Sequence, residues 1–511
     1  MGWDREGIQQ QPPQWKELLG YVERGANLHT HSGCVRPGDV FVALPGSKTD
    51  GTQYIPQALA NGAAWIVHPG HVQPESGSTE ARFVACADMG TALGTLAAAR
   101  YQTDRKRPLL IGITGTNGKT TVSYLVEHLW RFRGKECGII GTICYRWKGQ
   151  EKTADLTTPG CLDLHAMVAR MSQDGVDAVC MEVSSHALDQ QRTSGLTFDL
   201  TVFTNLTQDH LDYHQDMEAY FQVKSRLFTD SNCPSIVNFD DPYGRRLAGL
   251  ARPGRGYSLT GTEIGGWPCL HGRIEQMHRT GQVVSMQDTS KESWTLRSGL
   301  VGRHNASNLL TAQAVGLELG CDPEELTALE TFSGPPGRLQ RIENRLGLHV
   351  FVDYAHTPDA LDNVLSSLGE LDFERLFVVF GCGGDRDPGK RPLMGQAVAK
   401  HADVCVLTSD NPRHEDPEQI MQQVLPGLAD CPRVICNPDR RQAICTALEL
   451  LGPKDALLIA GKGHECTQQI KDKKLPFSDE QVVLETLNPR DTRYEAQFGP
   501  YRPGHAGGGG L

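Results

Sequence analysis

The 511-residue sequence has no apolar run long enough to cross a bilayer, no excess of positive charge and no CxxC cysteine pair. A spanning helix needs about 20 predominantly apolar residues, so we expect no membrane insertion. Lys and Arg number 50 against 61 Asp and Glu, a net charge of -11 that argues against a nucleic-acid partner. The opening segment, MGWDREGIQQQPPQW, lacks the basic and apolar regions of a secretory signal, so we expect a cytoplasmic protein.

The 15 cysteines are spread along the chain, and many of them lie inside apolar segments. Cys180, Cys405 and Cys445 are of this kind, which favours reduced, buried thiols over a disulfide framework. Without a CxxC pair, a structural zinc site is not expected either. Hydrophobic residues make up 39% and charged residues 22%, a globular balance that excludes a largely disordered or fibrous chain.

Apolar segments alternate with helical stretches, which predicts an α/β fold of three domains. Residues 1–107 are predicted to form a small α/β domain, 108–335 a central P-loop ATPase-like domain with a parallel sheet, and 336–490 a Rossmann-like domain. The segment SGPPGRLQRI marks the second boundary, because its prolines and glycines interrupt a helix. We expect a hairpin-rich insertion around 251–300 and a disordered tail at 491–511.

The segment TGTNGKTT at 114–121 follows a short apolar strand and precedes an amphipathic helix. Gly115 and Gly118 allow backbone amides to converge on phosphate oxygens, Lys119 supplies a positive charge, and the Thr120 hydroxyl can bind Mg²⁺. The usual motif, GxxxxGK[ST], is modified here, because its first glycine is replaced by isoleucine. A plain glycine turn is the alternative, but the strand-to-helix context favours an ATP-binding loop.

The segment MEVSSHALDQQR at 181–192 begins where another apolar strand ends, the edge at which parallel sheets bind ligands. Glu182 could bind Mg²⁺, while Ser184, Gln190 and Arg192 offer donors to a polar, anionic substrate. Taken singly, each of these residues is more typical of a surface or capping position, but the position directly after a strand favours ligand binding.

The segment NLTQDHLDYH at 205–214 follows the next strand and holds Asp209, His210, Asp212 and His214. We interpret this cluster as a second metal or phosphate position at the same edge of the sheet. Helix capping is the alternative, because Asp and His also occupy caps.

The phosphate-loop variant resembles that of the Mur ligase family, cytoplasmic enzymes that add amino acids to the peptidoglycan precursor, and that of the related folylpolyglutamate synthetases. Further segments resemble that family in the order VRPGDVFVALPG, TGTNGKTT, MEVSSH, NLTQDHLDYH, VKSRLF, GRHNASN, VDYAHTP, GCGGDRDPGKRPLM, SDNPRHEDP and AGKGHE. The order of these segments is similar to that in one branch of the family, whose members join meso-diaminopimelate to the D-glutamate of UDP-N-acetylmuramoyl-L-alanyl-D-glutamate. The resemblance implies ATP and Mg²⁺ as cofactors and the UDP-N-acetylmuramoyl dipeptide and meso-diaminopimelate as substrates; we expect a monomer.

The resemblance also implies roles for single residues. The residues implied to bind ATP are Gly115, Thr116, Asn117, Gly118, Lys119, Thr120, Thr121, Asn305, Asn308, Arg338 and Asp353. The implied metal ligands are Thr120, Glu182, His210 and Lys224, the last as a carbamylated lysine with a carboxylate-like end. Lys119, His210 and Lys224 are the implied catalytic residues.

The first domain is implied to hold the UDP end of the substrate. The residues implied to contact the UDP-sugar peptide are Ser32, Thr157, Thr158, Ser184, Gln190 and Arg192. The chain departs from the family at two places: it reads THSGCV where DSRxV is usual, and Leu156 stands where the family often has Asn. The first departure leaves the local uridine contacts open.

The residues implied to bind diaminopimelate are Arg386, Asp410, Asn411, Pro412, Arg413, Gly461 and Glu465. Diaminopimelate differs from lysine by a second carboxylate, which a guanidinium can bind through two parallel hydrogen bonds. Arg413 is suited to that task. The alternative is that the DNPR segment forms only an Asx-Pro turn.

A carboxylate is a poor acyl donor, so the implied reaction requires its phosphorylation by ATP to an acyl phosphate that an amine then attacks. Two other functions remain open: a ligase of the same fold that adds lysine or glutamate to a different acceptor, and a non-catalytic ATP-binding protein that senses a cell-wall precursor. Arg413 argues against lysine, and VDYAHTP with DNPR against the folate enzyme. The retained set Lys119, Glu182, His210 and Lys224 argues against a sensor.

Overall fold

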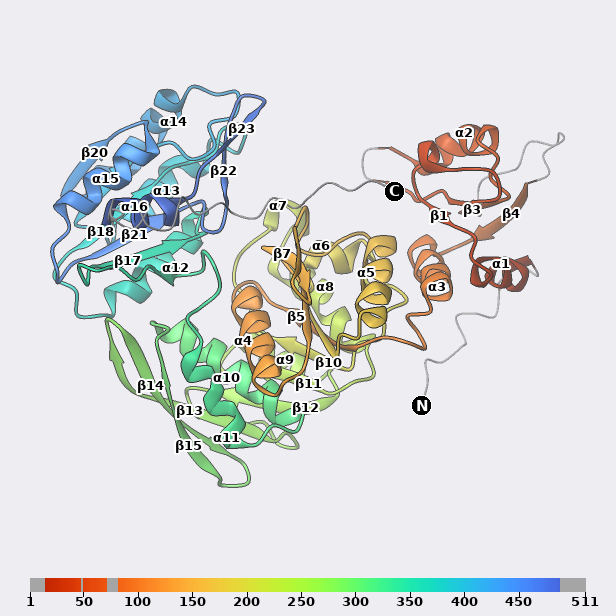
Figure 1. The fold of residues 1–511 in the computed structure, drawn as a ribbon, viewed down its shortest axis with the longest axis horizontal. Coiled ribbons are helices and arrows are strands. Elements are labelled where there is room, and N and C mark those ends of the chain that lie inside the picture. The colour runs from red at the N-terminus through yellow and green to blue at the C-terminus, as the bar shows by residue number, and fades with distance from the viewer. Residues whose placement is uncertain (1–13, 47–48, 71–80, 488–511) are drawn as a thin grey trace, which may run out of the picture. The chain divides into compact units, whose positions relative to one another are not determined.

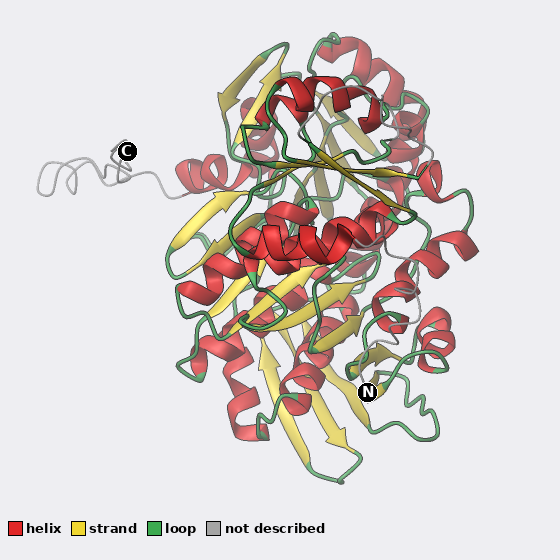
Figure 2. Ribbon diagram, turned by 90° about the vertical axis from the view of Figure 1, so that its right-hand side faces the viewer, coloured by secondary structure: helices red, strands yellow, loops and turns green. Residues whose placement is uncertain are grey.

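The computed structural model describes residues 14–46, 49–70 and 81–487. The predicted tail at 491–511 and most of the opening segment lie outside the described residues. The described chain is a mixed α/β protein whose strands form three larger sheets and one two-stranded hairpin, with helices beside them (Figure 1, Figure 2). None of the described helices combines the length and the apolar character needed to cross a membrane.

The chain divides into two compact units. The first unit extends to Glu275 and also contains Val283–Ser298 and His304–Phe332. The second unit contains Gln276–Gln282, Gly299–Arg303 and the chain from Ser333 onward. The three domain boundaries expected from the sequence stay predictions.

The first unit begins with a small parallel sheet. Its strands, in spatial order, are β1 (Leu28–His29), β2 (Val40–Val42), β3 (Trp65–Pro69) and β4 (Arg82–Cys86). The accompanying helices are α1 (Gln14–Glu23), η2 (Ser32–Cys34), η3 (Gly51–Tyr54), α2 (Ile55–Ala60) and α3 (Met89–Tyr101). Helix α3 begins after Asp88, whose side chain accepts a 3.0 Å hydrogen bond from the Thr91 amide, a strong N-cap.

The second sheet of this unit has a long parallel centre. Its spatial order is β15 (Ser293–Ser298), β14 (Gly281–Asp288), β13 (Cys269–His278), β12 (Pro253–Ser258), β11 (Ser235–Asn238), β10 (Leu200–Phe203), β5 (Leu109–Thr114), β9 (Ala178–Glu182), β6 (Cys137–Ile140), β7 (Cys144–Trp147) and β8 (Gln150–Thr153). The strands from β13 to β6 pair in parallel, as expected. Within the region expected to be hairpin-rich, β13, β14 and β15 are consecutive neighbours joined by short turns, whereas β12 belongs to the parallel run. The antiparallel pair β7 and β8 was not predicted.

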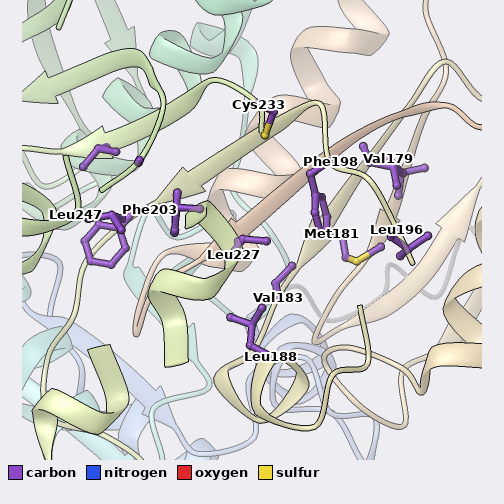
Figure 3. Close-up of a cluster of buried hydrophobic side chains, with 14 of the residues drawn as sticks. Val179, Met181, Val183, Leu188, Leu196, Phe198, Phe203, Leu227, Cys233 and Leu247 are labelled. Carbon is purple, nitrogen blue, oxygen red and sulfur yellow. The ribbon is translucent and has the colours of Figure 1, made fainter. Parts of the chain in front are cut away.

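Helices connect these strands. They are α4 (Lys119–Phe132), α5 (Cys161–Gln173), α6 (Ser185–Asp189), α7 (Leu211–His214), α8 (Met217–Thr229), α9 (Pro242–Ala248), α10 (Arg303–Glu318), α11 (Pro323–Leu326) and η4 (Thr327–Thr331). The core between sheet and helices contains Val179, Met181, Phe198, Phe203 and Leu227 (Figure 3). Burial of such a side chain contributes about 1.5–3 kcal/mol, so this core fixes the strand ends that carry the polar motifs.

The second unit contains a six-stranded sheet. Its spatial order is β16 (Gln340–Arg341), β17 (His349–Asp353), β21 (Ala456–Ala460), β18 (Leu376–Phe380), β19 (Val404–Leu407) and β20 (Arg433–Cys436). All pairs are parallel except β16 with β17. The helices are α12 (Pro358–Gly369), α13 (Lys390–Ala399), α14 (Pro417–Val424), η5 (Leu425–Leu428), α15 (Arg440–Leu450) and α16 (Asp479–Leu487). The expected Rossmann-like α/β arrangement is therefore confirmed.

A small antiparallel hairpin, β22 (Thr467–Ile470) with β23 (Lys473–Pro476), completes the second unit and was not predicted. Its backbone holds the DNPR segment, because the Arg413 amide donates to the Gln469 carbonyl at 3.1 Å and the Lys471 amide to the Arg413 carbonyl at 2.7 Å. The loop that carries Asp410 to Arg413 is thus fastened to the β22–β23 hairpin through main-chain hydrogen bonds.

A fully buried ion pair supports the same region. The guanidinium of Arg440 contacts Asp479 through two 2.7 Å hydrogen bonds, and both side chains are 0% exposed. Arg440 also donates to the carbonyls of Ser409 and Ala460, the residues that precede Asp410 and Gly461. The pair therefore joins the ends of β19 and β21.

We expect Asp479→Ala to lower the free energy of unfolding by about 3–5 kcal/mol, because it leaves the Arg440 charge buried and unpaired. The matched control is Glu485→Ala, which removes the partner of the neighbouring Arg441 in a pair that is 53% and 43% exposed. That control should change stability by less than about 1 kcal/mol. Denaturant unfolding of both variants measures the difference, and equal effects would contradict a structural role for the buried pair.

Candidate active site

The phosphate loop lies between β5 and α4 in a conformation that needs its glycines. Gly115 and Gly118 have φ angles of 149° and 87°. A Cβ on Gly118 would lie 2.5 Å from Oδ1 of Asn308. Asn205 holds the loop from the end of β10, because its carbonyl accepts from the Thr116 amide and its side-chain Oδ1 from the Asn117 amide, both at 2.9 Å.

Lys119 folds back over this loop. Its Nζ donates to the carbonyls of Gly115 and Thr116, each at 2.9 Å. Asn308 and Asn305 lie on α10, are buried and are joined by a 3.1 Å hydrogen bond from Asn308 Nδ2 to Asn305 Oδ1. Since Asn308 faces Gly118, the structure brings this predicted nucleotide ligand to the loop.

Glu182 connects the phosphate loop to the neighbouring strand ends. The side chain is 0% exposed and accepts a 3.0 Å hydrogen bond from the Thr120 hydroxyl. Thr142, just after β6, donates to the same carboxylate from its amide at 3.0 Å and from its hydroxyl at 2.9 Å. The predicted metal ligands Thr120 and Glu182 are therefore adjacent.

The predicted dipeptide-binding side chains gather beside Glu182. Thr158 donates its hydroxyl to the Glu182 carbonyl at 2.8 Å and accepts the Ser184 amide at 3.0 Å. Arg192 donates to the Thr158 carbonyl at 2.8 Å and to Gln190 Oε1 at 2.7 Å. Burial lowers the pKa of Arg192 below its usual value.

Thr157 continues this group. Thr157 Oγ1 and Thr142 Oγ1 lie 3.2 Å apart, so the threonine pair reaches the residues around Glu182. Leu156, at the second departure from the family, is 47% exposed. The whole group belongs to the first unit and forms one polar surface at the ends of β9 and β6.

Ser32 differs from these residues because its hydroxyl is already engaged. It is 3% exposed and donates to Gln57 Oε1 at 2.7 Å, while its carbonyl accepts from Asn61 Nδ2 at 2.9 Å. His31 precedes it and caps η2 through its ring nitrogen. The structure therefore shows Ser32 as a support of the THSGCV turn, and its predicted uridine contact stays a prediction.

Lys224 is buried against the phosphate loop. It is 2% exposed, and its Nζ donates to the Gly115 carbonyl at 3.0 Å and the Thr114 hydroxyl at 3.3 Å. Nζ also lies 4.9 Å from the centre of the Tyr220 ring. Among the described residues, none of the ion pairs formed involves Lys224. Burial, with a contribution from Lys119, holds the pKa of Lys224 well below its usual value.

Three histidine rings lie next to one another beside Tyr220, the ring that Lys224 faces. The His186 ring centre lies 5.1 Å from that of His210 and 5.7 Å from that of His214, and His214 stacks on Tyr220 at 4.9 Å. Burial lowers the pKa of His210, which has a φ of 55°, so its neutral ring is available as a ligand.

The remaining members of the 209–214 cluster have different surroundings. His214 shares a 2.8 Å hydrogen bond with Ser185, and Asp209 accepts the His210 amide at 2.8 Å. The side chain of Asp212 lies outside the described part of the structure. In that part no group of three or more His, Cys, Asp or Glu side chains is arranged to hold a metal ion.

Two predicted nucleotide ligands belong to the second unit. Asp353 ends β17, and its carboxylate accepts the amides of Leu339 at 2.5 Å and Ala355 at 2.7 Å. Burial raises the pKa of Asp353 although Arg338 opposes the shift. The guanidinium of Arg338 lies 4.8 Å from the centre of the Tyr354 ring.

The predicted amino-acid ligands also form a group within the second unit. Asn411 Nδ2 donates to Glu465 Oε2 at 3.0 Å, and Arg413 donates to the Gly384 carbonyl at 2.6 Å. The side chains of Arg413 and Arg386 both lie beside Gly383. A Cβ placed on that glycine would be 3.0 Å from Nη1 of Arg413 and 3.6 Å from Cγ of Arg386. The left-handed φ of 49° at Arg413 turns the chain at this point.

Asp410, Pro412 and Gly461 complete the group. Asp410 is 6% exposed, its Oδ1 accepts no hydrogen bond among the described residues, and burial raises its pKa. A Cβ on Gly461, whose φ is 114°, would lie 2.8 Å from Asp410 Oδ2. The carbonyl of Pro412 lies against Gly384.

Sequence reasoning missed residues that support the predicted ones. Thr142, Asn205 and Lys462 were not singled out, although each follows an apolar strand, which is the signal that identified Glu182. Tyr220 gave no signal, because an aromatic residue on a helix is typical of a core.

The chain is similar to known proteins over most of its length. Three family descriptions match: "Mur ligase family, catalytic domain" at residues 27–101, "Mur ligase middle domain" at 113–316 and "Mur ligase, glutamate ligase domain" at 337–463. A protein of Lawsonia intracellularis named UDP-N-acetylmuramoyl-L-alanyl-D-glutamate--2,6-diaminopimelate ligase is 52% identical over 458 residues, 89% of this chain and 94% of its own. A protein of the same name from Pseudomonas aeruginosa is 42% identical, covering 92% and 96%.

Solved structures show the same relation. One titled as a UDP-N-acetylmuramoyl-L-alanyl-D-glutamate--2,6-diaminopimelate ligase is 32% identical, covers 91% of this chain and 95% of its own, and has a TM-score of 0.67. MurF ligase from Thermotoga maritima in complex with ADP, at 16% identity and a TM-score of 0.58, covers 92% and 98% and shares the fold.

Proposed function

This chain belongs to the Mur ligase family, and from that premise we propose that it joins meso-diaminopimelate to the D-glutamyl side chain of UDP-N-acetylmuramoyl-L-alanyl-D-glutamate, with cleavage of ATP to ADP and phosphate. The observation that carries the proposal is the position of Glu182. Its buried carboxylate contacts Thr120 of the phosphate loop on one side and Thr142, next to Thr157, on the other. Phosphoryl transfer and acceptor binding therefore meet at one strand end.

The chemistry follows from the groups present. A carboxylate oxygen attacks the γ-phosphorus of ATP, ADP leaves, and the acyl phosphate is attacked by the amine, which releases phosphate and forms the amide. Lys119 neutralises charge on the transferred group, while Arg192 and Gln190 offer donors to the acceptor. Two contacts support these roles: Lys119, at the start of α4, lies over the phosphate loop, and Arg192, just after α6, donates to the Thr158 carbonyl beside Glu182.

The residues around Glu182 fit Mg²⁺. A hydroxyl and a carboxylate are hard oxygen ligands, and Mg²⁺ takes one or two carboxylates with phosphates and waters as its other ligands. Thr120 and Glu182 would hold it, and the ion would neutralise the phosphate charge that develops during transfer. The Thr120 hydroxyl oxygen and Glu182 Oε2 are 3.0 Å apart, which is close enough for both oxygens to bind one ion.

We extend the proposal to carbamylation of Lys224. A neutral amine attacks CO₂ and loses a proton to give a carbamate, and the depressed pKa of this buried lysine makes the neutral form available. The carbamate would add oxygen ligands beside His210, whose ring is also neutral.

Selection of diaminopimelate is assigned to the second unit. Arg413 and Arg386 offer positive charge to the distal carboxylate, and Glu465 offers a carboxylate to the distal ammonium. We also propose that the chain acts in the cytoplasm, because its proposed substrate is a UDP-linked precursor, and that it acts as a monomer.

For Arg413→Ala we expect a rise in the KM for diaminopimelate that corresponds to about 2–5 kcal/mol, because the bound carboxylate loses its charge partner in a closed site. The weak activity with lysine should hardly change. Phosphate release with the UDP-dipeptide and ATP, with each amino acid and with none, measures both values. Arg441→Ala, which removes an exposed cation of the same unit, is the control.

An equal loss for both amino acids would mean that Arg413 only supports its turn through Gly384. Wild-type protein that releases no phosphate with diaminopimelate would refute the proposed function itself.

For Lys224→Ala we expect near-complete loss of activity and partial recovery with formate or acetate, which fill the space and replace the carbamate oxygens. Lys224→Met fills the same space with an apolar chain and should not recover. Intact mass under CO₂ and phosphate release measure the two effects. An active enzyme with unmodified Lys224 would exclude the carbamate.

A further inference from the structure

Lys462 lies in the segment after β21, and its side chain is 0% exposed. Its Nζ donates to Glu465 Oε2 at 2.7 Å and to Asn411 Oδ1 at 3.1 Å, and lies 3.8 Å from Asp410 Oδ1. Three residues with a proposed part in amino-acid binding thus meet on one buried ammonium group.

These contacts fix the orientation of Asn411. Its Oδ1 accepts from Lys462 and also from the Gln469 amide at 2.8 Å, so the amide oxygen is occupied by two donors. Its Nδ2 donates to Glu465 Oε2 at 3.0 Å, which leaves the second N–H of Asn411 to a ligand. Glu465 Oε2 also accepts two hydrogen bonds, one from Asn411 and one from Lys462, and neither of these two bonds involves Glu465 Oε1.

The charge of Glu465 depends on the same lysine. Burial raises its pKa, while the charge and hydrogen bond of Lys462 and the Asn411 amide lower it below the usual value. The other charged or titratable groups that face this cluster are Asp410, His464, Arg440 and Tyr354. Lys462 is the one that donates directly to Glu465.

We propose that Lys462 is a positioning residue for amino-acid selection, which holds Asn411 and Glu465 as an adjacent donor and acceptor for a carbon that carries both a carboxylate and an ammonium group. The inference rests on the proposed function. Lysine lacks the distal carboxylate, so only diaminopimelate would use both members of the pair.

In Lys462→Met, burial dominates the pKa of Glu465, and the carboxylate becomes neutral as the pH falls. The KM for diaminopimelate should then rise by about tenfold for each pH unit below the new pKa. In the wild type and in Lys462→Arg, which keeps the charge, the KM should stay nearly flat between about pH 8 and pH 5. The KM for ATP should not change in any of the three.

Two control variants separate positioning from general effects. Lys454→Met removes an exposed lysine that pairs with Glu374 at 2.6 Å and should leave the profile unchanged. His464→Gln removes a neighbouring titratable group, whose pKa burial lowers to about 4. If the rise in KM at low pH persists when His464→Gln is combined with Lys462→Met, the rise belongs to Glu465.

The proposal would be overturned if Lys462→Met raised the KM for diaminopimelate by the same factor at all pH values and Lys462→Arg raised it equally. That result would indicate that Lys462 has only a packing role. A second measurement needs no substrate. The NMR signal of the Glu465 side-chain carboxyl carbon, assigned by its loss in Glu465→Gln, should titrate at higher pH in Lys462→Met than in the wild type. An unchanged titration would refute the inference even if diaminopimelate is not the amino acid used. Failure of the wild type to use diaminopimelate, with a shifted titration, would refute only the proposed function.

Discussion

One buried carboxylate, Glu182, connects the parts of the catalytic edge. It lies at the end of β9 and is out of contact with water, so it is stable only while donors satisfy its oxygens. Those donors come from the phosphate loop, through Thr120, and from the end of β6, through Thr142. Any shift of one strand end against another would break these bonds, and the parallel pairing of Ile113 with Glu182 and Thr114 with Phe203 keeps the ends in register.

The second unit uses a similar arrangement with the opposite charge. Its polar loops leave β19 and β21 at the same edge of the sheet, where Arg440 fastens both through their carbonyls. Lys462 then arranges the side chains that follow. In both units a buried charge organises the loops that follow the strand ends.

Much of this architecture could be predicted from the sequence, for physical reasons that also explain the misses. Strands such as β5, β9 and β21 are continuous apolar runs, because they are buried on both faces. The hairpins β7–β8 and β22–β23 escaped prediction, since every residue of β8 and β23 is exposed and neither strand has the continuous apolar run of a buried strand. Glu182 and the phosphate loop could be found from position alone. Thr142 and Lys462 follow apolar strands as Glu182 does, but their partners, and the engaged hydroxyl of Ser32, could not be predicted, because they depend on contacts between distant segments that no local pattern encodes.

The most direct measurement uses the UDP-dipeptide labelled with ¹⁸O in both oxygens of the D-glutamyl side-chain carboxylate, incubated with ATP and diaminopimelate. The account predicts an amide product that retains one label and released phosphate that carries the other, because the acyl phosphate transfers one carboxylate oxygen to phosphorus. Both are expected only when the amino acid is present, and mass spectrometry detects them together. Phosphate without label, or labelled phosphate without a diaminopimelate-containing product, would contradict the account.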